Sequence, residues 1–346
     1  MSNQFKISER EKLILFCIIQ QYILNATPIG SRFLTKKYSL GLSSATIRNI
    51  MADLEEMGFL DHPHTSAGRI PTDKGYRYFV DNLMKIEKIS EQQQEQLYKI
   101  LSEAAQDSNN LLESTSQILS KLTNLISYVS YPKLHIAILE KIQLVYIDSN
   151  KILVVVIIKK GPIKTITFEI DTVIRPEKLY FVEQILNEKL SGLSFKDIQY
   201  TIKERISENI DINDSVIRFI IDYSDKIFSE SIDNNNFIVY SDAEVLNNPE
   251  FENYENLKAI IEILQDKSII VHLVENIHTT SNDVVFKIGE ENPNDLLKNY
   301  SIAYKQYKKD NFVGNIVLVG PKRMNYSKVT SLLNFTSEIF SNHLKI

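Results

Sequence analysis

The chain contains a single cysteine, Cys17, among its 346 residues. One cysteine excludes an internal disulfide, and such sparing use of cysteine fits a reducing compartment. The longest apolar runs, Leu13–Ile19 and Ile152–Ile158, are too short to cross a bilayer. The polar and charged start of the chain is unlike a secretory signal peptide. We therefore expect a cytoplasmic protein that has no membrane span.

Motifs of the common catalytic sites are also lacking. The sequence has no glycine-rich phosphate loop, no Gly-x-Ser-x-Gly elbow and no clustered set of catalytic His, Asp and Glu residues. His62 and His64 are separated by Pro63 and accompanied by no cysteine or third histidine, so we expect no metal site there. The other histidines stand singly, at His135, His272, His278 and His343. These absences predict a protein that is not an enzyme and needs no cofactor.

Charge is distributed unevenly along the chain. The net charge is −5, which argues against a protein that coats nucleic acid indiscriminately. Residues 1–85 carry 11 Lys/Arg against 8 Asp/Glu, a balance of +3, and the remainder carries 28 against 36, a balance of −8. A weakly basic head on an acidic body favours localised contact with DNA. The length is sufficient for two or three domains.

The first 60 residues predict three helices. Ser8 and Glu11 have the spacing of a capping box and open a helix that runs to about Asn25. Its apolar residues cover most of its circumference, so we expect it to be buried on more than one side, with Cys17 in the core. Thr27-Pro28 marks the start of a second helix, and Ser43 or Ser44 caps a third.

The third helix has two unlike faces. Its apolar side is formed by Ile47, Ile50, Met51, Leu54 and Met57, at helical spacing. The opposite side begins with groups that bond phosphates or base edges and ends with acidic residues that phosphates repel. Only the first two turns are therefore expected to enter a DNA groove. The candidate DNA-binding residues of this helix are Ser43, Ser44, Ala45, Thr46, Arg48 and Asn49.

A polar, basic loop between two short strand-like segments follows this helix, as the wing follows the third helix of a winged helix-turn-helix. Arg69 and the loop residues His64, Thr65 and Ser66 are predicted to touch the DNA backbone or reach the minor groove. Thr72 is expected to cap a short helix after the wing. An alternative from the residues alone is a winged helix that binds protein rather than DNA.

Two long stretches of this head resemble one family. They are the run from Leu42 to Gly58, LSSATIRNIMADLEEMG, and the run from Pro63 to Arg77, PHTSAGRIPTDKGYR. Later segments look like motifs of the same family in the same order: NPEF at 248–251, IGEEN at 288–292 and GPKRMNY at 320–326. Over essentially its whole length the chain resembles the bacterial heat-inducible transcription repressor HrcA family.

The resemblance implies a cytoplasmic homodimeric repressor that binds an inverted-repeat operator upstream of chaperone operons. It also implies that a GroE-type chaperonin promotes folding into the active form, so that repression is relieved when misfolded proteins occupy the chaperonin. The implied architecture is an α+β multidomain protein: an N-terminal winged helix-turn-helix and a GAF-like α+β domain with an inserted, mostly helical dimerising domain.

The rest of the chain gives a coarser pattern. Residues 86–129 read as helix with a break at 107–110, and three β-rich runs from 135 to 170 predict an antiparallel meander. Strands are expected near 237–240, 284–288 and 314–319, with helices at 293–309 and from Tyr326 to His343. The expected borders are 1–85 for the winged helix, 86–107 for a helical linker, 108–174 with 266–346 for the GAF-like domain, and 175–265 for the dimerising insertion.

Two further interpretations remain open at this stage. Because GAF-type folds often hold a small ligand, Arg323 is a candidate anion contact; the alternative is that it braces or caps the last helix. A sheet domain that senses a metabolite predicts a ligand-dependent change in DNA affinity. A protein-binding winged helix predicts little salt dependence of any contact with nucleic acid.

Overall fold

The computed structural model describes residues 7–63, 68–105, 108–130, 133–134, 137–159, 163–170, 175–207, 215–228, 237–266, 268–275, 283–309 and 312–343. These residues divide into two compact units. The first unit comprises Met1–Ser130, Phe237–Tyr307 and Asn315–His343, and the second comprises Tyr131–Asn236, Lys308–Gly314 and Leu344–Ile346.

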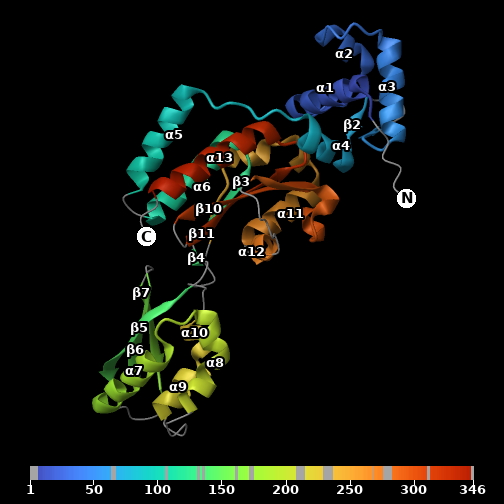
Figure 1. Ribbon diagram of the computed structural model, residues 1–346. Helices are drawn as coiled ribbons and strands as arrows, with labels where there is room; N and C mark the ends of the chain where they lie inside the picture. Colours follow the sequence, from blue (N-terminus) through green and yellow to red (C-terminus); the bar gives the residue numbers. More distant parts are fainter. Residues whose placement is uncertain are drawn as a thin grey trace. The chain divides into compact units, whose positions relative to one another are not determined.

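The first unit begins with the head, a bundle of short helices followed by a hairpin (Figure 1). Its elements are α1 (Glu9–Asn25), α2 (Ser31–Lys37), α3 (Ser44–Glu56), β1 (Leu60–Asp61), β2 (Ile70–Pro71), α4 (Asp73–Tyr78) and a π-helical turn (Phe79–Leu83). The capping box predicted at Ser8 and Glu11 is confirmed, and so is the cap at Thr72. Helix α1 packs against α3, β2 and α4, and Cys17 is buried within this core, as predicted.

The remainder of the first unit is a sheet with helices on both faces, here called the sheet domain. Its helices are α5 (Glu91–Ala104), α6 (Ser108–Thr123), α11 (Tyr254–Gln265), α12 (Ser268–Glu275) and α13 (Tyr326–His343). Its strands are β3 (Ile126–Ser130), β8 (Phe237–Tyr240), β9 (Val285–Ile288), β10 (Tyr300–Lys309) and β11 (Phe312–Pro321). They are ordered β8-β3-β11-β10-β9, and β4 (Lys133–Leu134) pairs with β11.

The alternation of side chains along β3 shows which helices cover each face of this sheet. Ile126 and Tyr128 of β3 share a core with Ile260 of α11 and Ile270 of α12. The side chain of Ser127, between them, points to the opposite face, where it is also buried and where α6 packs against β3. Helices α6 and α13 therefore lie on one face, and α11 and α12 on the other (Figure 1).

The predicted helix at 293–309 is wrong, because β10 occupies most of it. This strand lies between β11 and β9, and its first six residues are all buried, so its sequence lacks the alternation that marks a half-exposed strand. The preceding segment is shaped by the buried amide of Asn292. Its Nδ2 donates to the carbonyls of Gly289, Leu297 and Tyr300, at 3.0 to 3.1 Å.

In its described residues, the second unit is a three-stranded antiparallel sheet with four helices. Its elements are β5 (Leu139–Asp148), β6 (Lys151–Ile158), β7 (Ile163–Glu169), α7 (Pro176–Leu190), α8 (Phe195–Ser207), α9 (Ser215–Asp222) and α10 (Ser224–Ile227). The strands pair in the order β5-β6-β7, so the predicted meander is confirmed. Strand residues such as Ile142 and Val154 share one core with Leu179 of α7 and Ile198 of α8.

The division between units differs from the expected borders. The meander was assigned to the GAF-like domain at 108–174, yet it shares its core with the helices that follow it. Residues 237–265 were assigned to the insertion, yet β8 pairs with β3 and α11 packs into the core of the sheet domain. Buried contacts between segments far apart in sequence decide both borders, and local patterns do not contain that information.

Candidate DNA-binding surface

Helix α3 presents its polar face to solvent. Ile47, Ile50, Met51 and Leu54 are buried against the head. Because the helix repeats every 3.6 residues, burial of this stripe leaves the other side exposed. Ala45, Thr46, Arg48 and Asn49 are all exposed, as a DNA-reading face requires.

The start of α3 is fixed by its own cap. The exposed Ser43 is the N-cap residue, and its hydroxyl accepts a hydrogen bond from the Thr46 backbone N–H at 3.1 Å. The two hydroxyls also lie 2.9 Å apart. The remaining N–H groups of a first turn have no partner within the helix, so the start of a helix favours anions.

Ser44 has a structural partner. Its hydroxyl lies 3.1 Å from that of Ser31, which is buried at the start of α2, and Ser44 itself is half-buried. This contact brings the first turns of α2 and α3 together. Arg32 and Lys36 of α2 are exposed, and they extend the cationic surface beyond the residues that the sequence singled out. The signal available in the sequence was the pair Ser31-Arg32, which opens a helix directly before α3.

The wing is the hairpin of β1 and β2, and the segment just before α2 pairs with it at Ile29 and Arg69. Leu60 pairs with Pro71 and Asp61 with Ile70, and Arg69 exchanges two backbone hydrogen bonds of 2.9 Å with Ile29, just before α2. A Cβ atom at Gly68 would lie 2.5 Å from the Ile29 backbone, so this close approach requires glycine. The predicted loop contacts His64, Thr65 and Ser66 lie outside the described residues.

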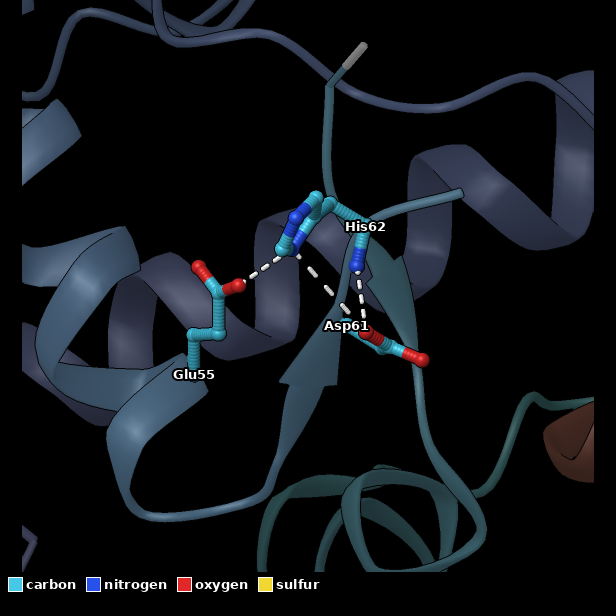
Figure 2. Close-up of side chains that lie close together, drawn as sticks. All are labelled: Glu55, Asp61 and His62. Atoms are coloured by element: carbon cyan, nitrogen blue, oxygen red, sulfur yellow. Dashed lines mark hydrogen bonds and ion pairs between the residues drawn. The ribbon is translucent and has the colours of Figure 1, made fainter. Parts of the chain in front are cut away.

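Glu55 ties α3 to the base of the wing (Figure 2). Its Oε1 contacts His62 Nδ1 in a short hydrogen bond, and its Oε2 lies 2.6 Å from Arg69 Nε. The Arg69 N–H does not point at that oxygen in hydrogen-bond geometry, so the attraction is one of charges. The sequence alone indicates only that Glu55 belongs to the acidic end of α3, which phosphates repel. A DNA contact by Arg69 stays a prediction, and its pairing with Glu55 is what the structure adds.

Glu55, Asp61 and His62 have ligand atoms within 4.8 Å of one another, which is close enough to consider a metal ion. Figure 2 shows that these groups already have partners. Asp61 Oδ1 accepts a hydrogen bond of 2.7 Å from the His62 backbone N–H, and Glu55 holds the Arg69 guanidinium. A cation beside Glu55 opposes the binding of a second one. We therefore interpret the cluster as a brace that orients the wing relative to α3.

The surroundings of Arg323 do not favour a role as an anion contact. Its side chain is only 12% exposed, and its Nε and Nη2 pair with the Glu250 carboxylate. Its Nη1 donates a hydrogen bond of 2.9 Å to the Ile23 carbonyl at the end of α1. The residue therefore joins three segments of the first unit, which is a bracing role.

Helices α1, α2 and α3, followed by the β1–β2 hairpin, have the arrangement of a winged helix-turn-helix, a class that is typical of transcription regulators. Residues 109–330 match the family described as HrcA protein C terminal domain. The chain is 33% identical to the heat-inducible transcription repressor HrcA of Chlorobium phaeobacteroides (strain BS1), with 98% of each chain covered. It is 36% identical to that of Acetivibrio thermocellus, with 98% of this chain and 97% of that protein covered. The chain belongs to the HrcA family of heat-inducible transcription repressors, which are not enzymes.

A crystal structure described as that of a hypothetical protein supports the fold. It matches with a TM-score of 0.56 at 21% identity, covering 98% of this chain and 99% of the other. Within the part of the chain that the structure describes, no helix is long and apolar enough to cross a membrane.

Proposed function

We propose that this chain represses heat-shock chaperone operons by binding an inverted-repeat operator as a homodimer, with the first two turns of α3 in the major groove. The observation that carries the proposal is the exposure of Thr46, Arg48 and Asn49 on one face of a capped helix. Exposed cations on the neighbouring α2 add affinity for phosphates that does not depend on sequence.

Each residue has a role that follows from its chemistry. Arg48 has the fork that bonds guanine O6 and N7, and Asn49 can bond adenine N6 and N7. Ser43 and Thr46 hold the helix start and offer hydroxyls to a phosphate, and Ala45 provides an apolar surface for a thymine methyl group. Arg32 and Lys36 serve as phosphate contacts beside the recognition helix.

The second unit is our candidate for the dimerising domain, in place of the borders 175–265 expected from the sequence. Its helices expose large aromatic side chains: Tyr180 and Phe181 of α7 are 64% and 58% exposed, and Tyr200 of α8 is 77% exposed. Aromatic groups in such numbers at a surface favour a protein interface. A two-fold symmetric dimer requires an operator with inverted symmetry.

Control by a GroE-type chaperonin belongs to the same proposal and rests on the family resemblance. A repressor that needs the chaperonin to fold would lose activity when misfolded proteins compete for it. The name GAF-like for the sheet domain and a cytoplasmic location rest on the same resemblance.

The direct test is fluorescence anisotropy with a labelled inverted-repeat operator and a scrambled duplex, at two salt concentrations, with and without chaperonin. We expect the folded dimer to prefer the operator, with affinity that falls steeply as salt rises. A preference that increases with chaperonin supports control at the level of folding. Little salt dependence and no preference would instead favour a winged helix that binds protein.

Arg48→Ala tests the recognition helix. We expect loss of operator discrimination worth about 1–3 kcal/mol for one bidentate contact, roughly a five- to 150-fold change, with the dimer intact. Lys258→Ala is the matched control, because it removes an exposed cation of α11 whose side chain is 63% exposed. If the Arg48 variant keeps the wild-type ratio of operator to scrambled binding, the recognition-helix assignment is wrong.

A further inference from the structure

The sequence stretches that carried the family resemblance meet at one contact within the first unit. Helix α4, which follows the wing, belongs to the second of these stretches. In the sheet domain it touches the turn after β9, over Gly289–Glu291, and the turn after β11, at Lys322. None of these groups belongs to the DNA-reading face. DNA reading by the recognition helix therefore does not account for this contact.

Arg77 of α4 makes the most extensive link. Its Nε and Nη2 donate to the two oxygens of Glu291 at 2.7 and 2.6 Å, in the parallel geometry that arginine and carboxylate prefer. Nη2 also donates to the Phe286 carbonyl at 2.7 Å, and Nη1 to Asp81 at 3.0 Å. Four hydrogen bonds fix the guanidinium in one orientation, so the end of α4 is held to the end of β9.

Asp73, at the start of α4, makes a second link. Its Oδ2 accepts a hydrogen bond of 3.0 Å from the Glu290 backbone N–H, and its Oδ1 lies 2.6 Å from Lys322 Nζ. The approach depends on Gly289, whose φ of +56° is one that L side chains rarely adopt. A Cβ atom there would lie 1.9 Å from Asp73 Oδ2. The link therefore cannot form as it stands with any other residue at 289.

Arg323 makes a third link through α1, since it donates to the Ile23 carbonyl while it pairs with Glu250 of the sheet domain. Between these polar links the contact is aromatic. The Tyr76 ring lies 5.8 Å from that of Tyr326, which meets Phe286 edge-on at 5.2 Å. Tyr76 is 2% exposed, so the contact excludes water at its centre.

The segment of chain between the head and the sheet domain is also fixed, by hydrogen bonds to α13. Residues 84–90 have no regular secondary structure, and the Ser327 hydroxyl of α13 donates to the Lys85 carbonyl at 2.7 Å. The Glu87 backbone N–H donates to the same hydroxyl oxygen at 2.7 Å, and the Ser331 hydroxyl bonds the Glu87 carbonyl. A linker fixed along a helix does not act as a flexible tether.

We propose that this contact is a latch that fixes the recognition helix relative to the sheet domain, so that Asp73, Arg77 and Arg323 limit the half-site spacings that the repressor accepts. The inference rests on the proposed function. In a dimer with rigid heads, the two recognition helices meet only half-sites separated by a matching number of base pairs. Heads on loose tethers would engage several spacings, each at a lower effective concentration.

The test measures operator affinity as a function of spacing. Duplexes carry the two half-sites at the native separation, at separations changed by about 2 and about 5 base pairs, the latter being half a helical turn, and as a single half-site. Wild-type protein is compared with Arg77→Ala, Gly289→Ala and the control Lys258→Ala. Gly289→Ala is the sharpest variant, because it disrupts the latch without changing the charge of the protein.

We expect wild type and Lys258→Ala to prefer one spacing by about tenfold or more, and both latch variants to bind all spacings within about threefold, with single half-site affinity unchanged. Limited trypsin digestion tests, in the absence of DNA, whether the latch is formed. Lys85 and Lys88 are exposed in the held linker, and we expect faster cleavage there in both latch variants.

The outcomes separate the two proposals. A wild-type protein that prefers one spacing, with latch variants that keep the same preference, overturns the spacing inference and leaves the repressor function standing. Latch variants that bind the native operator more tightly overturn it as well, since the contact would then oppose binding. A folded wild-type dimer that binds no spacing better than scrambled DNA contradicts the proposed function itself.

Discussion

Cys17 shows how burial decides the chemistry of a single residue. It is 2% exposed on the inner side of α1, and burial raises the pKa of its thiol to about 11. At pH 8 about one thiol in a thousand would be ionised, and the thiolate is the reactive form.

We therefore expect Cys17 to resist a thiol reagent in the native protein and to react fully in denaturant. Measured at increasing temperature, the labelling rate reports opening of the head, because this is the only cysteine in the chain. Rapid labelling of folded protein at pH 8 would contradict the buried position.

Glu55 shows, also at the scale of one residue, that the effect of a charged side chain depends on its neighbours in the folded protein. On α3 it belongs to an acidic end that phosphate repels, and in the folded head it holds His62 and Arg69 of the wing. In the folded head it therefore orients the wing relative to α3.

At the scale of elements, helix α4 joins the head to the sheet domain, and its first turn depends on Thr72. The Thr72 hydroxyl accepts a hydrogen bond from the Gly75 backbone N–H at 3.1 Å and donates to the Gly58 carbonyl at 2.7 Å. One hydroxyl thus caps α4 and ties it to the end of α3.

Thr72→Val removes both hydrogen bonds while keeping the shape of the side chain. We expect a loss of about 1–2 kcal/mol in the free energy of unfolding, measured by chemical denaturation, because a cap is lost and a carbonyl loses its donor. Thr35→Val is the matched control, since the Thr35 hydroxyl bonds the Ser31 carbonyl inside α2 and is exposed. A loss no larger than that of the control would refute the capping role.

At the scale of the whole molecule, the stability of the head against the sheet domain depends on ionised groups. Burial opposes ionisation of Glu291, but hydrogen bonds from Arg77 and from the Ile288 backbone N–H outweigh it, so the pKa of this carboxyl is lowered from 4.5. A group with a lowered folded pKa stabilises the fold above its unfolded pKa and loses that contribution as pH falls through the folded value.

We therefore expect wild type to unfold at a higher temperature than Glu291→Gln at pH 7, with a constant difference down to about pH 4.5. Below that pH the difference should shrink, because a protonated Glu291 resembles glutamine. Thermal unfolding followed by circular dichroism between pH 7 and pH 3 measures it. A difference that stays constant to pH 3 would show that the ion pair with Arg77 contributes nothing.

Local sequence was sufficient for most of the head and for the family. Caps at Ser8, Ser43 and Thr72, the apolar stripe of α3 and the β-rich runs of the meander are signals within a few residues, and the structure has each of them. The candidate residues of α3 followed from the same periodicity, because a helix with one buried stripe exposes the other side.

Tertiary structure alone decided three things. It placed the meander with α7–α10, made β10 a buried central strand, and gave Glu55, Arg77 and Arg323 their partners. Arg77 and Glu291 are 214 residues apart, and no local pattern encodes a pairing over that distance. Helix periodicity and capping depend on neighbours along the chain, whereas strand order, domain borders and the latch depend on which distant surfaces bury each other.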